Sequence, residues 1–111
     1  MPILREWRAQ IRRTNSEDYV RYIRSTGLAD YRKTPGNLGA LIAVREIDRD
    51  RVEVITMSLW ESWEAIREFA GDPPDRARYY PKDDEYLLTR PEKVKHYEAY
   101  GELMQIGGTT A

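Results

Sequence analysis

The sequence has no cysteine and only one histidine among its 111 residues. These two absences exclude disulfides, a thiol nucleophile, thiolate zinc and any site with two histidine ligands from one chain. No run approaches the roughly 20 apolar residues of a membrane-spanning helix, and the first residues lack the apolar core of a signal peptide. Eighteen Lys and Arg against nineteen Asp and Glu leave almost no net charge. We therefore expect a cytoplasmic protein with no nucleic-acid, membrane or metal partner.

Aromatic residues are plentiful, with eight Tyr and three Trp against one Phe. Tyr and Trp combine an apolar body with a polar tip, so they suit ligand cavities and interfaces, although they also cover strand faces. The chain length fits one domain, which we place at residues 1–102. Residues 103–111 offer little to anchor them, and we expect a loose C-terminal tail there.

The first half of the sequence predicts a strand, a helix and a hairpin. Residues 3–12 alternate, and the apolar residues on one side are Ile3, Trp7, Ala9 and Ile11. Thr14 and Glu17 have the spacing of a capping box, which predicts a helix that ends at Gly27. The apolar run 38–44 predicts a strand buried on both faces, and polar residues 48–51 connect it to a strand over 52–59.

The second half predicts a helix and a final strand. Ser62 is placed to cap a helix that Gly71 ends, with Trp63 in its packing stripe. Residues 72–75 are expected to start a short helix, and residues 82–89 another turn. Alternation over 94–100 predicts the last strand.

This order, β-α-β-β-α-β, predicts an α+β fold of the ferredoxin-like type. Two helices would cover one face of a four-stranded antiparallel sheet. The run 38–44 makes the other face apolar as well, and a chain of this length has little left to cover it. We therefore expect a homodimer that pairs through its sheet faces as a dimeric α/β barrel.

Several segments resemble the antibiotic biosynthesis monooxygenase (ABM) type of dimeric α/β barrel. The stretches that carry the resemblance are 35–39, 57–62, 65–71 and 94–98, and together with the element order they extend it over residues 3 to 100. The family includes cofactor-independent oxygenases acting on polycyclic aromatic substrates, haem-degrading oxygenases and members without known activity.

Residue by residue, the resemblance transfers only in part. Trp60 matches the family's Trp at the end of the third strand. Thr56 stands where the cofactor-free oxygenases have an activating Asn. The haem-degrading members have an Asn on the first strand and an iron-binding His after the second long helix, and neither is present here. Tyr80 is a poor substitute as an iron ligand without a neighbouring base, so the resemblance implies no cofactor.

Four residues are candidates for a site. His96 would move a proton with Glu98 beside it, or it is a structural histidine that bridges strands. Trp60 and Tyr80 would line a cavity between helices and sheet. Arg45 would hold an anion there, or it pairs with a glutamate on a neighbouring strand. The acidic residues between 72 and 85 lack the spacing of a calcium loop and indicate no metal site.

Two functions follow, and the sequence leaves open whether the chain is an enzyme. The first is a small dimeric ABM-like protein that binds a small aromatic or apolar ligand between helices and sheet. The alternative is a cofactor-independent monooxygenase acting on an aromatic or polyketide-type substrate, without metal or flavin. Haem degradation is a third and weaker possibility.

Overall fold

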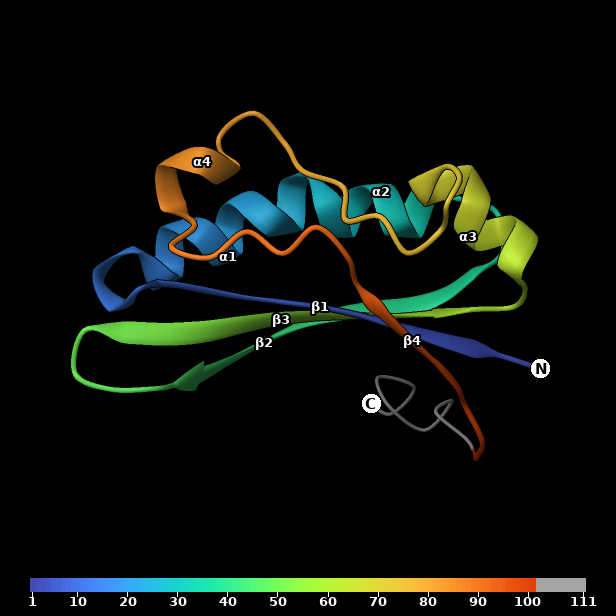
Figure 1. Ribbon diagram of the computed structural model, residues 1–111, viewed down its shortest axis with the longest axis horizontal. Helices are drawn as coiled ribbons and strands as arrows, with labels where there is room; N and C mark the ends of the chain where they lie inside the picture. The colour runs from blue at the N-terminus through green and yellow to red at the C-terminus, as the bar shows by residue number, and fades with distance from the viewer. Residues whose placement is uncertain (102–111) are drawn as a thin grey trace, which may run out of the picture.

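A four-stranded antiparallel sheet forms the base of the molecule in the computed structural model, which describes residues 1–101 (Figure 1). Its strands are β1 (Ile3–Arg12), β2 (Asn37–Glu46), β3 (Arg51–Trp60) and β4 (Lys95–Glu98). They lie in the order β2-β3-β1-β4, so β2 and β4 are the edges. The predicted ferredoxin-like arrangement is confirmed. The predicted tail, 103–111, lies outside the described residues.

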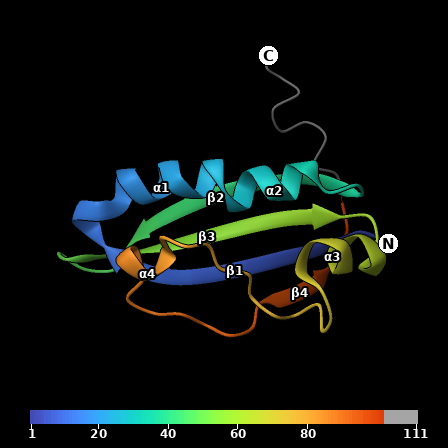
Figure 2. The ribbon, with the colours of Figure 1, turned by 90° about the horizontal axis from the view of Figure 1, so that it is seen from above.

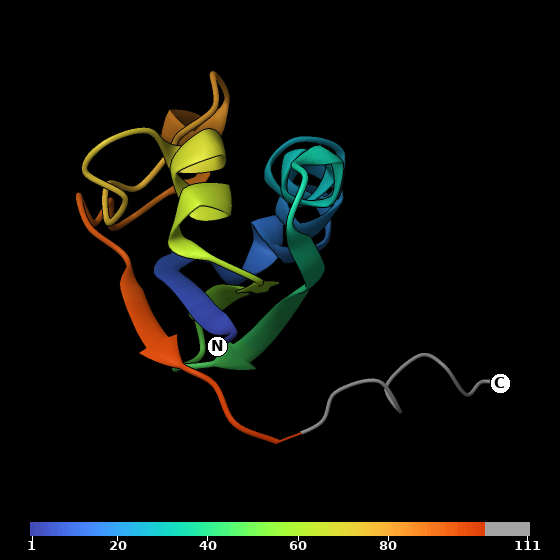
Figure 3. The ribbon, with the colours of Figure 1, turned by 90° about the vertical axis from the view of Figure 1, so that its right-hand side faces the viewer.

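The helices all lie on one face of this sheet, in two rows (Figures 2 and 3). One row holds the short 3-10 turn η1 (Arg13–Asn15), α1 (Ser16–Ser25) and α2 (Gly27–Lys33). The other holds α3 (Trp63–Ala70) and α4 (Asp83–Tyr86). No helix in residues 1–101 has the length and apolar character to cross a bilayer.

Several predicted helix boundaries are wrong. The capping box at Thr14 does not form, because the 3-10 turn occupies that position and α1 begins at Ser16 without a side-chain cap. The prediction that the first helix stops at Gly27 is confirmed, because α1 ends at Ser25 with Thr26 as its C-cap. Gly27 also opens a second helix, α2, which was not predicted and whose Tyr31 reaches the core. Residues 72–75 form no helix, whereas α4 does form within 82–89.

The predictions for α3 are largely confirmed. The Ser62 hydroxyl accepts a hydrogen bond from the backbone N–H of Ala65 at 3.1 Å and caps the helix. Gly71 ends it with a φ of 83°, a backbone conformation that favours glycine. Gly36, before β2, has a φ of 92°, and a Cβ there would lie only 2.5 Å from the Cβ of Ala65. The chain before β2 therefore packs closely against α3, and a side chain at position 36 would not fit.

The core lies between the sheet and the two rows of helices, in two clusters. One is centred on Trp7, Ile11 and Tyr19, and the other on Trp60, Ile66 and Phe69. The apolar residues that alternate along β1 therefore lie on the buried face of the sheet, as predicted. The prediction that 38–44 is buried on both faces is wrong for the single chain, because β2 is an edge strand and Leu41 is 44% exposed.

Candidate functional site

Trp60 is a core residue at the junction of β3 and α3. Its side chain is fully buried, and its indole N–H donates to the Ser58 hydroxyl at 2.8 Å. Its ring packs against those of Tyr31 and Phe69, with centroids 6.0 and 5.9 Å away. The ring packs with residues of α3, but Trp60 is not among the residues that line the cavity described below, where the sequence had placed it.

Tyr80 does line a cavity between the helices and the sheet. Its hydroxyl donates to a carboxylate oxygen of Asp30 at 2.7 Å. Burial raises the pKa of Tyr80, and the bond to Asp30 raises it further. The side chain is therefore a neutral phenol at physiological pH.

His96 lies on β4 beside Arg5 of β1, outside the cavity. The Nη1 of Arg5 is 3.1 Å from the Nε2 of His96. Because a guanidinium only donates, Nε2 accepts and the ring proton sits on Nδ1. Burial lowers the pKa of His96 to about 4, and the charge of Arg5 contributes. The expected partner Glu98 instead accepts from the hydroxyl of Tyr100. A neutral imidazole engaged in this way is a structural bridge and a weak base.

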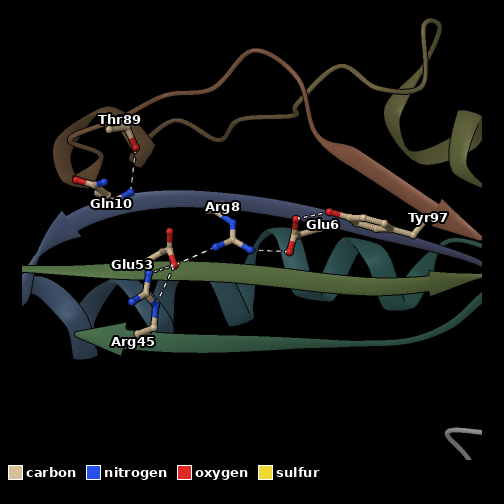
Figure 4. A network of polar contacts seen from close by, with 7 residues as sticks. All are labelled: Glu6, Arg8, Gln10, Arg45, Glu53, Thr89 and Tyr97. Carbon is tan, nitrogen blue, oxygen red and sulfur yellow. Dashed lines mark hydrogen bonds and ion pairs between the residues drawn. The ribbon is translucent and has the colours of Figure 1, made fainter. Parts of the chain in front are cut away.

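Arg45 lies on the opposite face of the sheet, away from the helices. Its guanidinium pairs with Glu53 at 3.1 Å, within a network that also contains Arg8 and Glu6 (Figure 4). This is the cross-strand pairing that the sequence left open as an alternative. Of the four candidates, only Tyr80 lines the cavity, and the structure does not bring the four together.

The cavity lies above Trp7 and Thr56, between the row of α1 and α2 and the segment that leads into α4. Its volume is about 30 Å³. Aromatic rings, hydroxyls, one cationic side chain (Arg78) and one carboxylate (Asp83) line it. The other lining residues include Trp7, Tyr19, Thr26, Tyr31, Thr56, Phe69 and Tyr80. A water needs about 10–15 Å³, whereas a dry cavity of about 150 Å³ holds benzene. The cavity as it stands has room for water-sized molecules.

Arg78 lines the cavity and is half-exposed to solvent. The carbon of its guanidinium lies 5.0 Å from the centre of the Phe69 ring and 5.4 Å from that of Tyr80. It also donates to the backbone carbonyl of Phe69 at 3.1 Å and lies 3.5 Å from Asp30. These contacts hold a half-exposed cation against two rings.

Asp83 supplies a buried carboxylate to the cavity wall. One oxygen accepts from the hydroxyl of Tyr19 at 2.8 Å, and the other accepts from the backbone N–H of Tyr80 at 2.6 Å. Burial raises the pKa of Tyr19, and the charge of Asp83 adds to the effect. The carboxylate thus fastens the start of α4 to α1 and keeps lone pairs that can accept a further hydrogen bond.

Arg5 is the most deeply buried charge near the site, with 1% of its surface exposed. It donates to the backbone carbonyls of Pro74 and Arg76 at 2.7 and 3.0 Å. No carboxylate of residues 1–101 forms an ion pair with it, and its Nε has no hydrogen-bond partner. Burial lowers the pKa of Arg5, while the nearby Tyr31 hydroxyl and Asp75 partly offset the effect.

Haem ligation does not fit these residues. The cavity holds no histidine, and the hydroxyl of Tyr80 is engaged by Asp30 with its pKa raised, so it is not a tyrosinate ligand. In the described chain, no three acidic or histidine side chains gather where they could hold a metal ion.

Several solved structures share this architecture, and two of them are compared with it below. One is a Bacillus cereus protein named as a candidate antibiotic biosynthesis monooxygenase, with a TM-score of 0.63 and 18% sequence identity. The other is Rv0793 from Mycobacterium tuberculosis, with a TM-score of 0.60 and 19% identity. Each alignment covers 92% of this chain and 98% of the other. The chain has the ABM-type fold.

The likeness to these two structures is one of fold, since the identities are 18% and 19%. No protein-family model and no curated protein matches the sequence. Within the ABM-type fold, Thr56 points to the helix side of β3 and contacts the hydroxyl of Tyr31 at 3.2 Å. The position that resembles the oxygenases' Asn therefore carries a hydroxyl pair on the cavity wall.

Proposed function

We propose that the chain is a homodimeric ABM-like protein that binds a small aromatic ligand in the cavity between helices and sheet. The observation that carries this is the cavity lining: aromatic rings with a few convergent polar groups, which is the usual character of a small-molecule site. The fold shared with the Bacillus cereus protein, which is named as a candidate antibiotic biosynthesis monooxygenase, supports the ABM-like part of the proposal.

A ligand larger than water enters this cavity only if Arg78 moves. Arg78 is the half-exposed member of the wall, and it belongs to an irregular segment between α3 and α4. When its guanidinium leaves, the rings of Phe69 and Tyr80 remain as the two sides of a slot. A planar aromatic ring suits such a slot, because stacked and edge-on ring contacts are both favourable.

The proposed dimer rests on the outer face of the sheet. Strand alternation places Leu4, Leu41, Met57 and Leu59 there, and Leu41 is paired directly with Met57. In the single chain, none of these four side chains is as buried as the core residues are. A second copy that packs its own outer face here would remove this apolar surface from water.

Titration calorimetry with a panel of phenols, naphthols and their hydrocarbon counterparts tests the ligand. We expect Arg78→Ala to bind a panel member several-fold more tightly than the parent, because the stacking of Arg78 on two rings no longer has to be broken. Arg67→Ala is the matched control, since Arg67 is a half-exposed arginine on α3 that lies outside the cavity. Absence of binding to both the parent and Arg78→Ala contradicts the proposal.

A cofactor-independent monooxygenase is the second candidate, and Asp83 favours it. This buried carboxylate lines the cavity, so it can accept the proton of a phenolic substrate where His96 cannot reach. The substrate anion would itself supply the electrons to oxygen. Oxygen uptake with the same phenols that Asp83→Asn abolishes supports this function, and binding without oxygen uptake excludes it for that panel.

A further inference from the structure

The hydroxyls of Tyr31 and Thr56 leave one hydrogen without an acceptor. Their oxygens are 3.2 Å apart, and either can be the donor. Two hydroxyls carry two hydrogens, and this bond uses one of them. The Arg5 guanidinium also lies near the Tyr31 hydroxyl, but a guanidinium only donates and therefore accepts neither hydrogen. One O–H donor is therefore left over at this pair.

Both side chains are more than nine-tenths buried, and both line the cavity. Tyr31 comes from α2 and Thr56 from the middle of β3, so elements from the helices and the sheet fix the pair from two sides. Leaving such a donor without an acceptor is costly in a buried site. The arrangement calls for an acceptor atom inside the cavity.

The charges around the pair favour an oxygen acceptor that carries partial negative charge. Arg5 and Tyr31 both contact Phe69, the first with its guanidinium carbon 5.5 Å from the ring centre and the second with ring centroids 4.6 Å apart. Arg78 faces the same ring from its side of the cavity. Asp83 is the acidic group on the cavity wall, and its two oxygens already accept from Tyr19 and Tyr80.

We propose that the Tyr31–Thr56 hydroxyl pair donates a hydrogen bond to a carbonyl oxygen of the ligand, and that the ligand is therefore an aromatic ketone or aldehyde. This rests on the proposed function, since it names the class of ligand for the same cavity. In the ligand-free protein a water fits the volume and can accept the bond, and the carbonyl oxygen replaces it.

A matched pair of ligands tests this directly. Acetophenone and 2-phenylpropene have the same shape, but one carries C=O where the other carries C=CH₂. We expect acetophenone to bind about tenfold more tightly, because the hydrocarbon leaves the buried donor unpaired. Infrared difference spectra between ¹³C and ¹²C carbonyl labels should show the stretch of bound acetophenone at lower frequency than in an apolar solvent.

Variants locate the effect. Tyr31→Phe combined with Thr56→Val removes both hydroxyls while keeping the size of each side chain, and it should abolish the tenfold preference and the infrared shift without weakening 2-phenylpropene binding. Thr26→Val is the control. It removes another cavity hydroxyl, but one whose hydrogen is already donated to the carbonyl of Tyr22 at 2.8 Å. Melting temperatures show whether each variant is folded.

Three results are decisive. Loss of the preference in the double variant, with the preference intact in Thr26→Val, supports the donor pair. Equal binding of the two ligands to the parent overturns the donor pair and leaves the ligand cavity standing. Failure of both ligands to bind the parent and Arg78→Ala overturns the donor pair together with the proposed function.

Discussion

The two faces of the sheet use alternate residues of the same strands and differ in almost every property. The helix side holds two apolar clusters and a small polar cavity, and its residues include Ile11, Val54 and Trp60, which are fully buried. The outer side carries a row of partly exposed apolar residues at one end and an ion network at the other. Stability therefore comes mainly from the helix side, whereas the outer side is the face of the proposed dimer.

The charged side chains in the ion network of the outer side are paired with one another. Arg8 bridges two carboxylates, at 2.7 Å from Glu6 and 3.1 Å from Glu53, and Tyr97 donates to Glu6 at 3.0 Å (Figure 4). Burial acts in the opposite direction, but the hydrogen bonds from Arg8 and Tyr97 lower the pKa of Glu6. Each charge has an opposite partner, so a second sheet can pack here without an unpaired charge.

The largest expected effect comes from the core of the helix side. Trp60→Ala removes a ring that is fully buried between β3 and α3, and it should lower the free energy of unfolding by about 3–5 kcal/mol. Trp63→Ala is the control, because Trp63 is 41% exposed and forms a T-shaped ring pair with His96. Chemical denaturation measures both. Similar losses for the two variants would contradict the assignment of Trp60 to the core and Trp63 to the surface.

Much of this contrast could be predicted from the sequence, and the exceptions have physical reasons. Alternation assigned the inward residues of β1 correctly, and Ser62 and Gly71 marked α3. The expectation for Trp63 was wrong, because periodicity places a residue on a helix face without showing where the covering chain stops. Position 5 shares the inward register of Ile3 and Trp7, so the pattern itself signalled a buried arginine.

The site was harder to predict than the fold. Tyr31 was missed because no helix was predicted after Gly27, where α2 begins. Asp83 was hidden within an acidic segment that is mostly exposed. Tertiary packing brings Arg78, Thr56 and Tyr31 to the wall of one cavity from distant segments of the chain. Local sequence spacing does not indicate contacts of this kind.

A substitution on the outer face should disrupt the proposed dimer. Leu41→Glu places a carboxylate in the apolar row, and we expect the proposed dimer to dissociate at least about a hundredfold more readily because that charge would be buried. The single chain should keep its fold, since Leu41 is 44% exposed. Light scattering across a concentration series measures the mass. A parent that stays at 13.1 kDa at all concentrations contradicts the dimer.

The third prediction concerns pH and His96. Its pKa is about 4 in the folded protein against 6.5 for the ordinary side chain, so the unfolded chain takes up a proton first as the pH falls. The free energy of unfolding should therefore fall between about pH 6.5 and 4, by roughly 1–2 kcal/mol after allowance for partial exposure. His96→Gln should lose less over the same window. Parallel curves for parent and variant would count against a buried neutral His96.

The smallest expected effect is in the ion network of the outer face. A double-mutant cycle of Arg8→Met and Glu53→Gln should give a coupling energy below about 1 kcal/mol that shrinks further in high salt, because Arg8 is nearly half exposed. A coupling of several kcal/mol in the monomeric Leu41→Glu background would show that the outer face contributes to stability as a core does.

A ¹H–¹⁵N correlation spectrum titrated with acetophenone tests most directly whether the ligand binds on the helix side. We expect amide shifts to change around the cavity, at residues near Tyr31, Thr56 and Tyr80, while those around Leu41 and Glu53 on the outer face stay constant. Shift changes centred on the outer face, or none at all up to millimolar ligand, would contradict the assignment of ligand binding to the helix side.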